Sequence, residues 1–135
     1  MSTLRNEKPM RERVLVIDDD LPAGEVLKMA MEAMNHEVRL AMDGESALKA
    51  IRNFVPDVVL CDINMPGITG YEVCKKMKED PRLQETLFVA QTGLSSNQSK
   101  QLSNQAGFKH HLVKPIDINA LLELVYLEQM GQWKQ

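Results

Sequence analysis

Cysteine, long apolar runs and positive charge are all scarce in this sequence, and each shortage excludes a class of protein. Two cysteines, Cys61 and Cys74, are too few for a disulfide framework. No apolar run approaches the ~20 residues that cross a bilayer, and the polar N-terminus lacks the apolar core of a signal peptide. We therefore expect a cytoplasmic chain with reduced thiols and no membrane association.

The charge balance argues against a nucleic-acid surface. The net charge is −3, and no stripe of Lys and Arg is present to neutralise phosphates. The chain has 135 residues, of which 44% are hydrophobic and 26% are charged, as in ordinary globular proteins. This size suits one domain with a single core and no direct nucleic-acid binding.

Short apolar runs rich in β-branched residues recur along the chain. Two of them, "VLVI" and "DVVLC", are continuously apolar, which is typical of strands covered on both faces of a parallel sheet. The strands that we predict are 13–18, 37–41, 57–61, 86–90 and 109–113.

Helical patterns alternate with these strands. Apolar residues recur at helical spacing in all but one of them, and Pro81 ends the third. The fourth helix, 95–107, has only Leu102 and Ala106 as an apolar stripe, and we infer it mainly because parallel strands need a crossover there. Gly131 is expected just past the end of the last helix. The stripes are Val26, Leu27, Ala30, Met31 and Met34; Ala47, Leu48 and Ile51; Val73, Cys74 and Met77; and Ile118, Leu121, Leu122 and Val125.

Five strand–helix units in a row predict an α/β fold, an open and doubly wound parallel sheet with helices on both faces. We place one domain at 13–130, a flexible leader at 1–12 and a short tail at 131–135. The sequence shows no internal repeat and no second domain.

The residues that follow the predicted strands carry chemistry. Strand one runs into three carboxylates at 18–20, strand three ends at Asp62, strand four near Thr92 and strand five at Lys114–Pro115. Ligands of open parallel sheets bind at the carboxyl ends of the strands, beside the point where the strand order reverses. In the flavodoxin-like order 2-1-3-4-5, strands one and three are neighbours there, so their carboxylates should converge.

Such a cluster of carboxylates, a hydroxyl group and a lysine suits phosphoryl chemistry. Crowded carboxylates raise each other's pKa unless a cation compensates, and Mg²⁺ prefers carboxylate oxygens together with water and phosphate. A carboxylate beside the metal can then act as a nucleophile toward a phosphoryl group and form an aspartyl phosphate.

In this arrangement the chain resembles a response-regulator receiver domain over roughly Arg13 to Met130. The resemblance is carried by four elements in order, each at a strand end: "VLVIDDD", "PDVVLCDINMPGITGYEVCKKMK", "TG" and "AGFKHHLVKP". The run "AGFKHHLVKPIDINALLEL" also resembles the C-terminal receivers of hybrid sensor histidine kinases. The chain is therefore either a stand-alone receiver or part of a larger protein.

The resemblance implies a role for each acidic residue. Asp62 matches the family's phospho-acceptor, and Asp18 and Asp19 match its metal-binding pair. Asn64 would lend its backbone carbonyl to the same Mg²⁺. Asp20 lies outside the pair, and we interpret it as a helix N-cap or a solvated charge.

The resemblance also implies the remaining site residues. Thr92 matches the hydroxyl that turns toward the phosphoryl group, and Lys114 matches the lysine that pairs with it. The bond between Lys114 and Pro115 is expected to be cis. His111 occupies the position where the family often has an aromatic switch residue, and an imidazole there changes charge near neutral pH.

The function implied is that of a two-component or phosphorelay switch. A histidine kinase or histidine phosphotransfer domain would supply the phosphoryl group to Asp62. Phosphorylation would then change the face formed by the fourth helix, fifth strand and fifth helix, which would bind a second copy or an output domain. The domain would catalyse its own phosphorylation and dephosphorylation but act mainly as a signalling switch.

Other classes use similar parts. A phosphatase of the haloacid-dehalogenase type also uses an aspartate nucleophile with Mg²⁺, but "DDDLP" lacks its DxDxT/V pattern. A flavodoxin-like cofactor binder needs a phosphate-cradling loop where this chain has acidic residues. A phosphorylation-independent interaction module remains a third alternative, although all the key residues are present.

Overall fold

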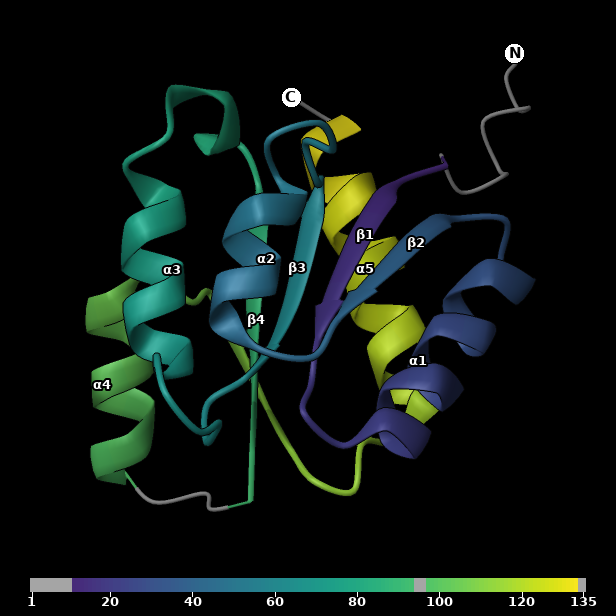
Figure 1. Cartoon of the computed structure of the whole chain (residues 1–135). Coiled ribbons are helices and arrows are strands. Elements are labelled where there is room, and N and C mark those ends of the chain that lie inside the picture. The colour runs from purple at the N-terminus through teal and green to yellow at the C-terminus, as the bar shows by residue number, and fades with distance from the viewer. Residues whose placement is uncertain (1–10, 94–96, 134–135) are drawn as a thin grey trace, which may run out of the picture.

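A computed structural model describes residues 11–93 and 97–133, and these form one parallel sheet of five strands in the order β2-β1-β3-β4-β5. Figure 1 shows the strands running in one direction, so their carboxyl ends lie along one edge of the sheet. This is the predicted fold class and strand order. The strands are β1 (Arg13–Ile17), β2 (Glu37–Ala41), β3 (Val58–Asp62), β4 (Leu87–Thr92) and β5 (His110–Val113).

The helices form a layer on each face of the sheet. In Figure 1, α1 and α5 cover one face, and α2, α3 and α4 cover the other. Within the described residues, no helix has the length and apolar character needed to cross a membrane. The helices are α1 (Leu21–Ala33), α2 (Gly44–Ala50), α3 (Gly70–Lys78), α4 (Asn97–Ala106) and α5 (Ile118–Trp133), with a short 3-10 helix at Pro81–Leu83.

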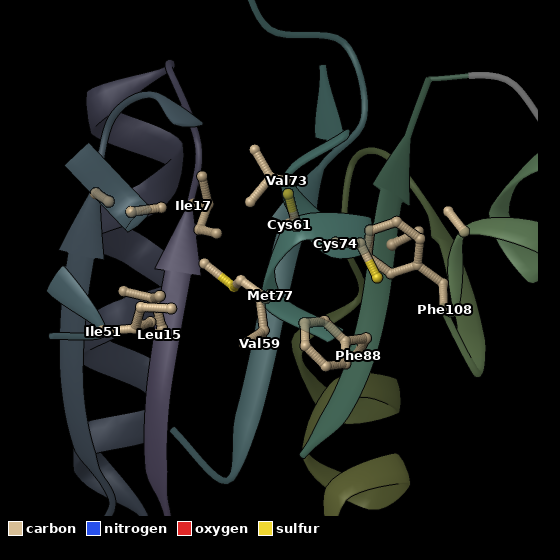
Figure 2. Close-up of a cluster of buried hydrophobic side chains, with 14 of the residues drawn as sticks. Leu15, Ile17, Ile51, Val59, Cys61, Val73, Cys74, Met77, Phe88 and Phe108 are labelled. Carbon is tan, nitrogen blue, oxygen red and sulfur yellow. The ribbon is translucent and has the colours of Figure 1, made fainter. Parts of the chain in front are cut away.

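Alternation along the strands divides the core into two layers. Leu15 and Ile17 of β1 point toward the side of α2 and α3, and Val14 and Val16 point toward α1 and α5. Figure 2 shows the first layer, in which side chains from β1, β3 and β4 pack against α3. Because both faces are covered, the continuous apolar runs of the sequence are explained.

The two cysteines are free and buried. Burial raises the pKa of the Cys74 thiol to about 12. Both therefore act as small apolar core residues.

The helix stripes were predicted correctly in the core and wrongly at three places. In the first stripe, Leu27 and Met31 are buried, but Val26 and Met34, which follows the end of α1, are 56% and 43% exposed. In α4, Leu102 is exposed, and Ser103 takes the buried position beside Ala106. Tertiary packing selects the inner face of these helices, and the apolar pattern alone did not reveal it.

The end of the last helix was also predicted wrongly. Gly131 lies inside α5, which continues to Trp133. Gln129, one turn before Trp133, is buried, so the helix is held against the sheet up to this point. A helical glycine costs about 1 kcal/mol relative to alanine, which such packing offsets.

Helix starts are fixed by side-chain caps. The Asp20 carboxylate accepts a hydrogen bond from the backbone of Ala23, so the cap interpretation of Asp20 is confirmed. Asp117 caps α5 in the same way through the backbone of Asn119 and Ala120. These caps set where each helix leaves the edge of the sheet that carries the acidic residues.

Candidate functional site

The acidic residues and the lysine meet at the carboxyl edge of the sheet. Asp18 directly follows β1, Asp62 is the last residue of β3, and Lys114 directly follows β5. The parallel registers of β1 with β3, β3 with β4, and β4 with β5 bring these three ends together. The rule that ligands bind at the carboxyl ends of the strands therefore located the cluster correctly.

The loop after β3 holds the Asp62 carboxylate in place. Its Oδ1 accepts a hydrogen bond of 3.0 Å from the backbone N–H of Asn64. Gly70, the first residue of α3, donates its N–H to the carbonyl of Ile63 at 3.1 Å. A Cβ at Gly70 would overlap the backbone of Asp62, so only glycine allows α3 to start this close to the strand end.

Lys114 bridges the two buried carboxylates. Its Nζ lies 2.9 Å from Asp62 Oδ2 and 3.4 Å from Asp18 Oδ2. Burial by itself lowers the pKa of Lys114, but the hydrogen bond and the charge of Asp62, with a further contribution from Asp18, outweigh it, and the net pKa is raised. The lysine therefore stays protonated beside the carboxylates. The Lys114–Pro115 bond is cis, as expected.

Asp18 is fully buried and incompletely satisfied. Its Oδ1 accepts the backbone N–H of Asp20 at 3.0 Å. Its Oδ2 has no hydrogen bond of good geometry, and the Lys114 ammonium group lies 3.4 Å from it. A buried carboxylate oxygen left in this state costs free energy unless a further positive group approaches it.

The donor set fits a divalent cation. Carboxylate oxygens of Asp18, Asp19 and Asp62 lie within 4.8 Å of one another, with Asp19 exposed and the other two buried. Three carboxylates face one ammonium group, which leaves an excess of two negative charges. Hard oxygen ligands around such an excess are what Mg²⁺ binds. Asn64 contacts the cluster because its N–H donates to Asp62. A contact between its carbonyl and the metal stays a prediction.

The two predicted switch residues lie on neighbouring strands. Thr92 is 2% exposed at the end of β4, and its carbonyl accepts the N–H of Lys114 at 2.7 Å. His111 is half-buried and stands opposite Ala90 of β4, three residues before Lys114. The structure therefore ties Thr92 to the lysine through the backbone, and the switch role of His111 stays a prediction.

Sequence reasoning missed Gln91. This side chain is fully buried, lies opposite Asp62 in the register of β3 with β4, and lines a cavity together with Asp18 and Lys114. Its only signal in the sequence is a polar residue inside the apolar run "LFVAQT". That signal does not show which face of the sheet the glutamine occupies.

Comparisons with known proteins point to one family. The family model of the response regulator receiver domain matches residues 14–126. Response regulator PleD of Caulobacter vibrioides is 36% identical over 108 residues, which cover 80% of this chain and 24% of PleD. The chain therefore spans about a quarter of the length of that relative.

Solved structures agree in fold. Chemotaxis protein CheY4 of Vibrio cholerae superposes with a TM-score of 0.82 at 28% identity, covering 86% of this chain and 97% of CheY4. The BeF3-activated receiver domain of DrrB from Thermotoga maritima has a TM-score of 0.79 at 28% identity, covering 88% of this chain and 99% of that one. Both likenesses extend over nearly the whole of the compared chains.

Proposed function

The chain belongs to the response regulator receiver domain family, and from this premise we propose that Asp62 is the residue that accepts the phosphoryl group. One observation carries the proposal: the Lys114 ammonium group lies closer to Asp62, at 2.9 Å, than to Asp18, at 3.4 Å, and the backbone N–H of Asn64 also donates to the Asp62 carboxylate at 3.0 Å. These contacts hold the carboxylate in one orientation at the edge of the sheet.

The reaction is a transfer from phosphohistidine to aspartate. A carboxylate oxygen of Asp62 attacks phosphorus, the P–N bond of the donor breaks, and its electron pair stays on the imidazole nitrogen. Lys114 offsets the negative charge that accumulates on the phosphoryl oxygens, and the Thr92 hydroxyl donates to one of them. Positioning and charge compensation supply most of the catalysis in reactions of this kind.

Asp18, Asp19 and the carbonyl of Asn64 would hold Mg²⁺ together with Asp62. When bound, the metal neutralises the excess charge of the cluster and of the phosphoryl oxygens. The chain's own part is to hold the carboxylates at one edge. Asp18 is fixed by the backbone N–H of Asp20, and Asp19 stays exposed to solvent.

The consequence of phosphorylation is a change in the face formed by α4, β5 and α5. A phosphoryl group adds up to two negative charges beside Lys114, and the backbone bond from Lys114 to Thr92 links this charge to the ends of β4 and β5. His111, on β5, would respond as the switch residue. A second copy or an output domain would bind the changed face.

The donor is a histidine kinase or a histidine phosphotransfer domain, and the setting is cytoplasmic. Residues 13–130 would make up the receiver, with a leader at 1–12, and residues 131–133 of the predicted tail at 131–135 continue α5. Residues 1–10, 134 and 135 lie outside the described part of the chain. Membership of a hybrid kinase stays a hypothesis from the segment "AGFKHHLVKPIDINALLEL". The family match does not favour a phosphatase, and a module independent of phosphorylation would not need the lysine contact.

The test is phosphorylation with acetyl phosphate and Mg²⁺, followed by intact mass. We expect an adduct of one phosphoryl group on the wild type and none on Asp62→Ala. The matched control is Asp57→Asn, which removes a carboxylate directly before the other end of β3 and should label like the wild type. Failure of the wild type to label, under conditions that label a known receiver, would falsify the proposal.

A further inference from the structure

Helix α4 turns little apolar surface toward the rest of the domain. Within residues 101–106, only Ser103 and Ala106 are buried, and Leu102 is 45% exposed. The main neighbour of α4 among the described elements is α3, and Figure 1 shows the two helices side by side. Both buried side chains of α4 are small. Their burial therefore contributes little to holding the helix in place.

The Ser103 side chain also carries a cost. Ser103 is 1% exposed, and its hydroxyl has no hydrogen-bond partner within the described part of the chain, not even a carbonyl of the preceding helical turn. In a position of the helix that is open to water, the same hydroxyl would be hydrated. The missing hydrogen bond therefore disfavours the packed position of α4 relative to an open one.

The C-terminal end of α4 is, by contrast, firmly attached. Gly107 has a φ of +111° and donates its N–H to the carbonyl of Asn104 at 3.1 Å. Phe108 donates its N–H to the carbonyl of Ser103 at 3.0 Å, and the two bonds together form a Schellman C-cap. The buried ring of Phe108 meets the ring of Phe88 edge to face, with 6.3 Å between centroids. The residue that follows the cap glycine is thus fixed to β4.

Gly107 itself lies against α3. A Cβ at this position would come within 3.0 Å of Lys78 Cε and 3.5 Å of Cys74 Sγ. The connection from α4 to β5 is therefore packed closely on both α3 and the sheet. One turn earlier, at Ser103, the same helix holds a buried group that favours opening. Attachment and its opposite are thus separated by a single turn.

We propose that α4 opens away from its packed position while Phe108 keeps its C-terminal connection in place, and that the buried Ser103 hydroxyl sets how readily it opens. In the packed position the hydroxyl lacks a partner, and in the open position water hydrates it. This inference deepens the proposed function and rests on it in one respect. The phosphoryl group on Asp62 is what would favour the open position.

The first test measures amide hydrogen exchange of residues 102–106 in the unphosphorylated full chain. The helix has only 10 residues, so it is not stable once it leaves its packing surface, and its amides then exchange. Ser103→Ala removes the hydroxyl and keeps the Cβ. We expect exchange to slow about tenfold, of which about fivefold comes from removing the buried hydroxyl.

Asn104→Ala is the matched control, because Asn104 is exposed and follows Ser103 in the same helix. Serine and asparagine are similarly poor helix formers relative to alanine, so both variants gain helix propensity alike. This gain should slow exchange about twofold in the control. An effect of Ser103→Ala no larger than that of the control overturns the proposal.

A high-resolution crystal structure of the unphosphorylated chain gives an independent readout. A Ser103 Oγ without a protein acceptor or water within hydrogen-bond distance supports the proposal. A hydroxyl that is bonded to either one overturns it, because the packed position would then carry no cost at Ser103.

The second test repeats the exchange measurement with Mg²⁺ and beryllofluoride as a mimic of the phosphoryl group. Exchange of residues 102–106 should rise in the wild type, and Ser103→Ala should stay about tenfold slower under the same conditions. Unchanged wild-type exchange in a chain that labels at Asp62 overturns the link between α4 opening and the phosphoryl group. A chain that does not label contradicts the proposed function instead, and the exchange of the unphosphorylated variants still decides the role of Ser103.

Discussion

The two ends of the sheet carry the same kinds of side chain and use them differently. At the carboxyl end, Asp18 and Asp62 share the ammonium group of Lys114, and a carboxylate oxygen of Asp19 lies within 4.8 Å of theirs. Negative charge is therefore concentrated and incompletely compensated. A site in this state can bind a cation and a phosphoryl group.

At the amino end, the polar groups serve the fold. Asp57 accepts the N–H of Arg13 at 2.8 Å, which ties the start of β3 to the start of β1. The Nδ1 of His36 accepts a hydrogen bond of 3.0 Å from the N–H of Glu12. This bond ties the residue before β2 to the residue before β1. At the amino end, a carboxylate and an imidazole with backbone partners stabilise the fold. At the carboxyl end, carboxylates crowded around one lysine are available for chemistry.

The largest difference between the ends should appear when a lysine is removed from each. Lys114→Met takes away the positive charge beside Asp62, and we expect the rate of labelling by acetyl phosphate to fall about 100-fold. Lys109, before β5, forms an exposed ion pair with Glu128 at 3.0 Å. Lys109→Met should label at the wild-type rate in the same intact-mass assay. Equal rates for the two variants would contradict the role given to Lys114.

The second difference concerns Mg²⁺ and stability. Binding to the folded state alone should raise the free energy of unfolding by about 2.7 kcal/mol at a Mg²⁺ concentration 100 times the dissociation constant. Asp19→Asn should remove most of this gain without harming the core, because Asp19 is exposed. Asp57→Asn, at the amino end, should keep it. Thermal unfolding with and without Mg²⁺ measures this gain in the wild type and both variants. If Asp19→Asn keeps the Mg²⁺-dependent gain in stability, Asp19 is excluded as a ligand.

The contrast between the ends also explains what the sequence could reveal. Asp62 and Lys114 were located before the structure because each directly follows a predicted strand, 57–61 or 109–113, and strand ends can be inferred from apolar runs. The parallel order then brings such residues to one edge without any knowledge of packing. The carboxyl end was predictable because its chemistry depends on topology alone.

The amino end and the cavity were not predictable because they depend on register and packing. The bond between Asp57 and Arg13 exists only because β1 and β3 pair with Val14 opposite Val58. The position of Gln91 beside Lys114 depends in the same way on which face of β4 the glutamine occupies. The pattern within one strand does not by itself show which residue of a neighbouring strand stands opposite.

A smaller effect is expected at the amino end itself. Asp57→Ala leaves the N–H of Arg13 without its carboxylate partner, and we expect a loss of about 1 kcal/mol in the free energy of unfolding. Asp19→Asn in the absence of Mg²⁺ should cost nothing or stabilise slightly, since it relieves repulsion within the acidic cluster. Urea unfolding of both variants in a chelating buffer gives the comparison. A greater loss in Asp19→Asn would reverse the roles assigned to the two ends.

The smallest effect concerns pH and His36. Burial lowers the pKa of this imidazole from its usual 6.5, and its Nδ1 is an acceptor only when that nitrogen is unprotonated. The unfolded chain takes up the proton first as pH falls, so this stabilisation is present above the unfolded pKa and is lost as pH falls through the folded pKa. The nearby Glu12 has a raised pKa, mainly from burial, and acts in the opposite direction.

The measurement for His36 is urea unfolding between about pH 7.5 and 5.5, where His36 should dominate the local titration. Wild type should lose stability over this interval, and His36→Gln should lose less, because its side chain does not titrate. The Mg²⁺-dependent gain at the carboxyl end should be the same in both proteins at each pH. A variant that lost as much stability as the wild type would show that the amino end does not sense pH through this imidazole.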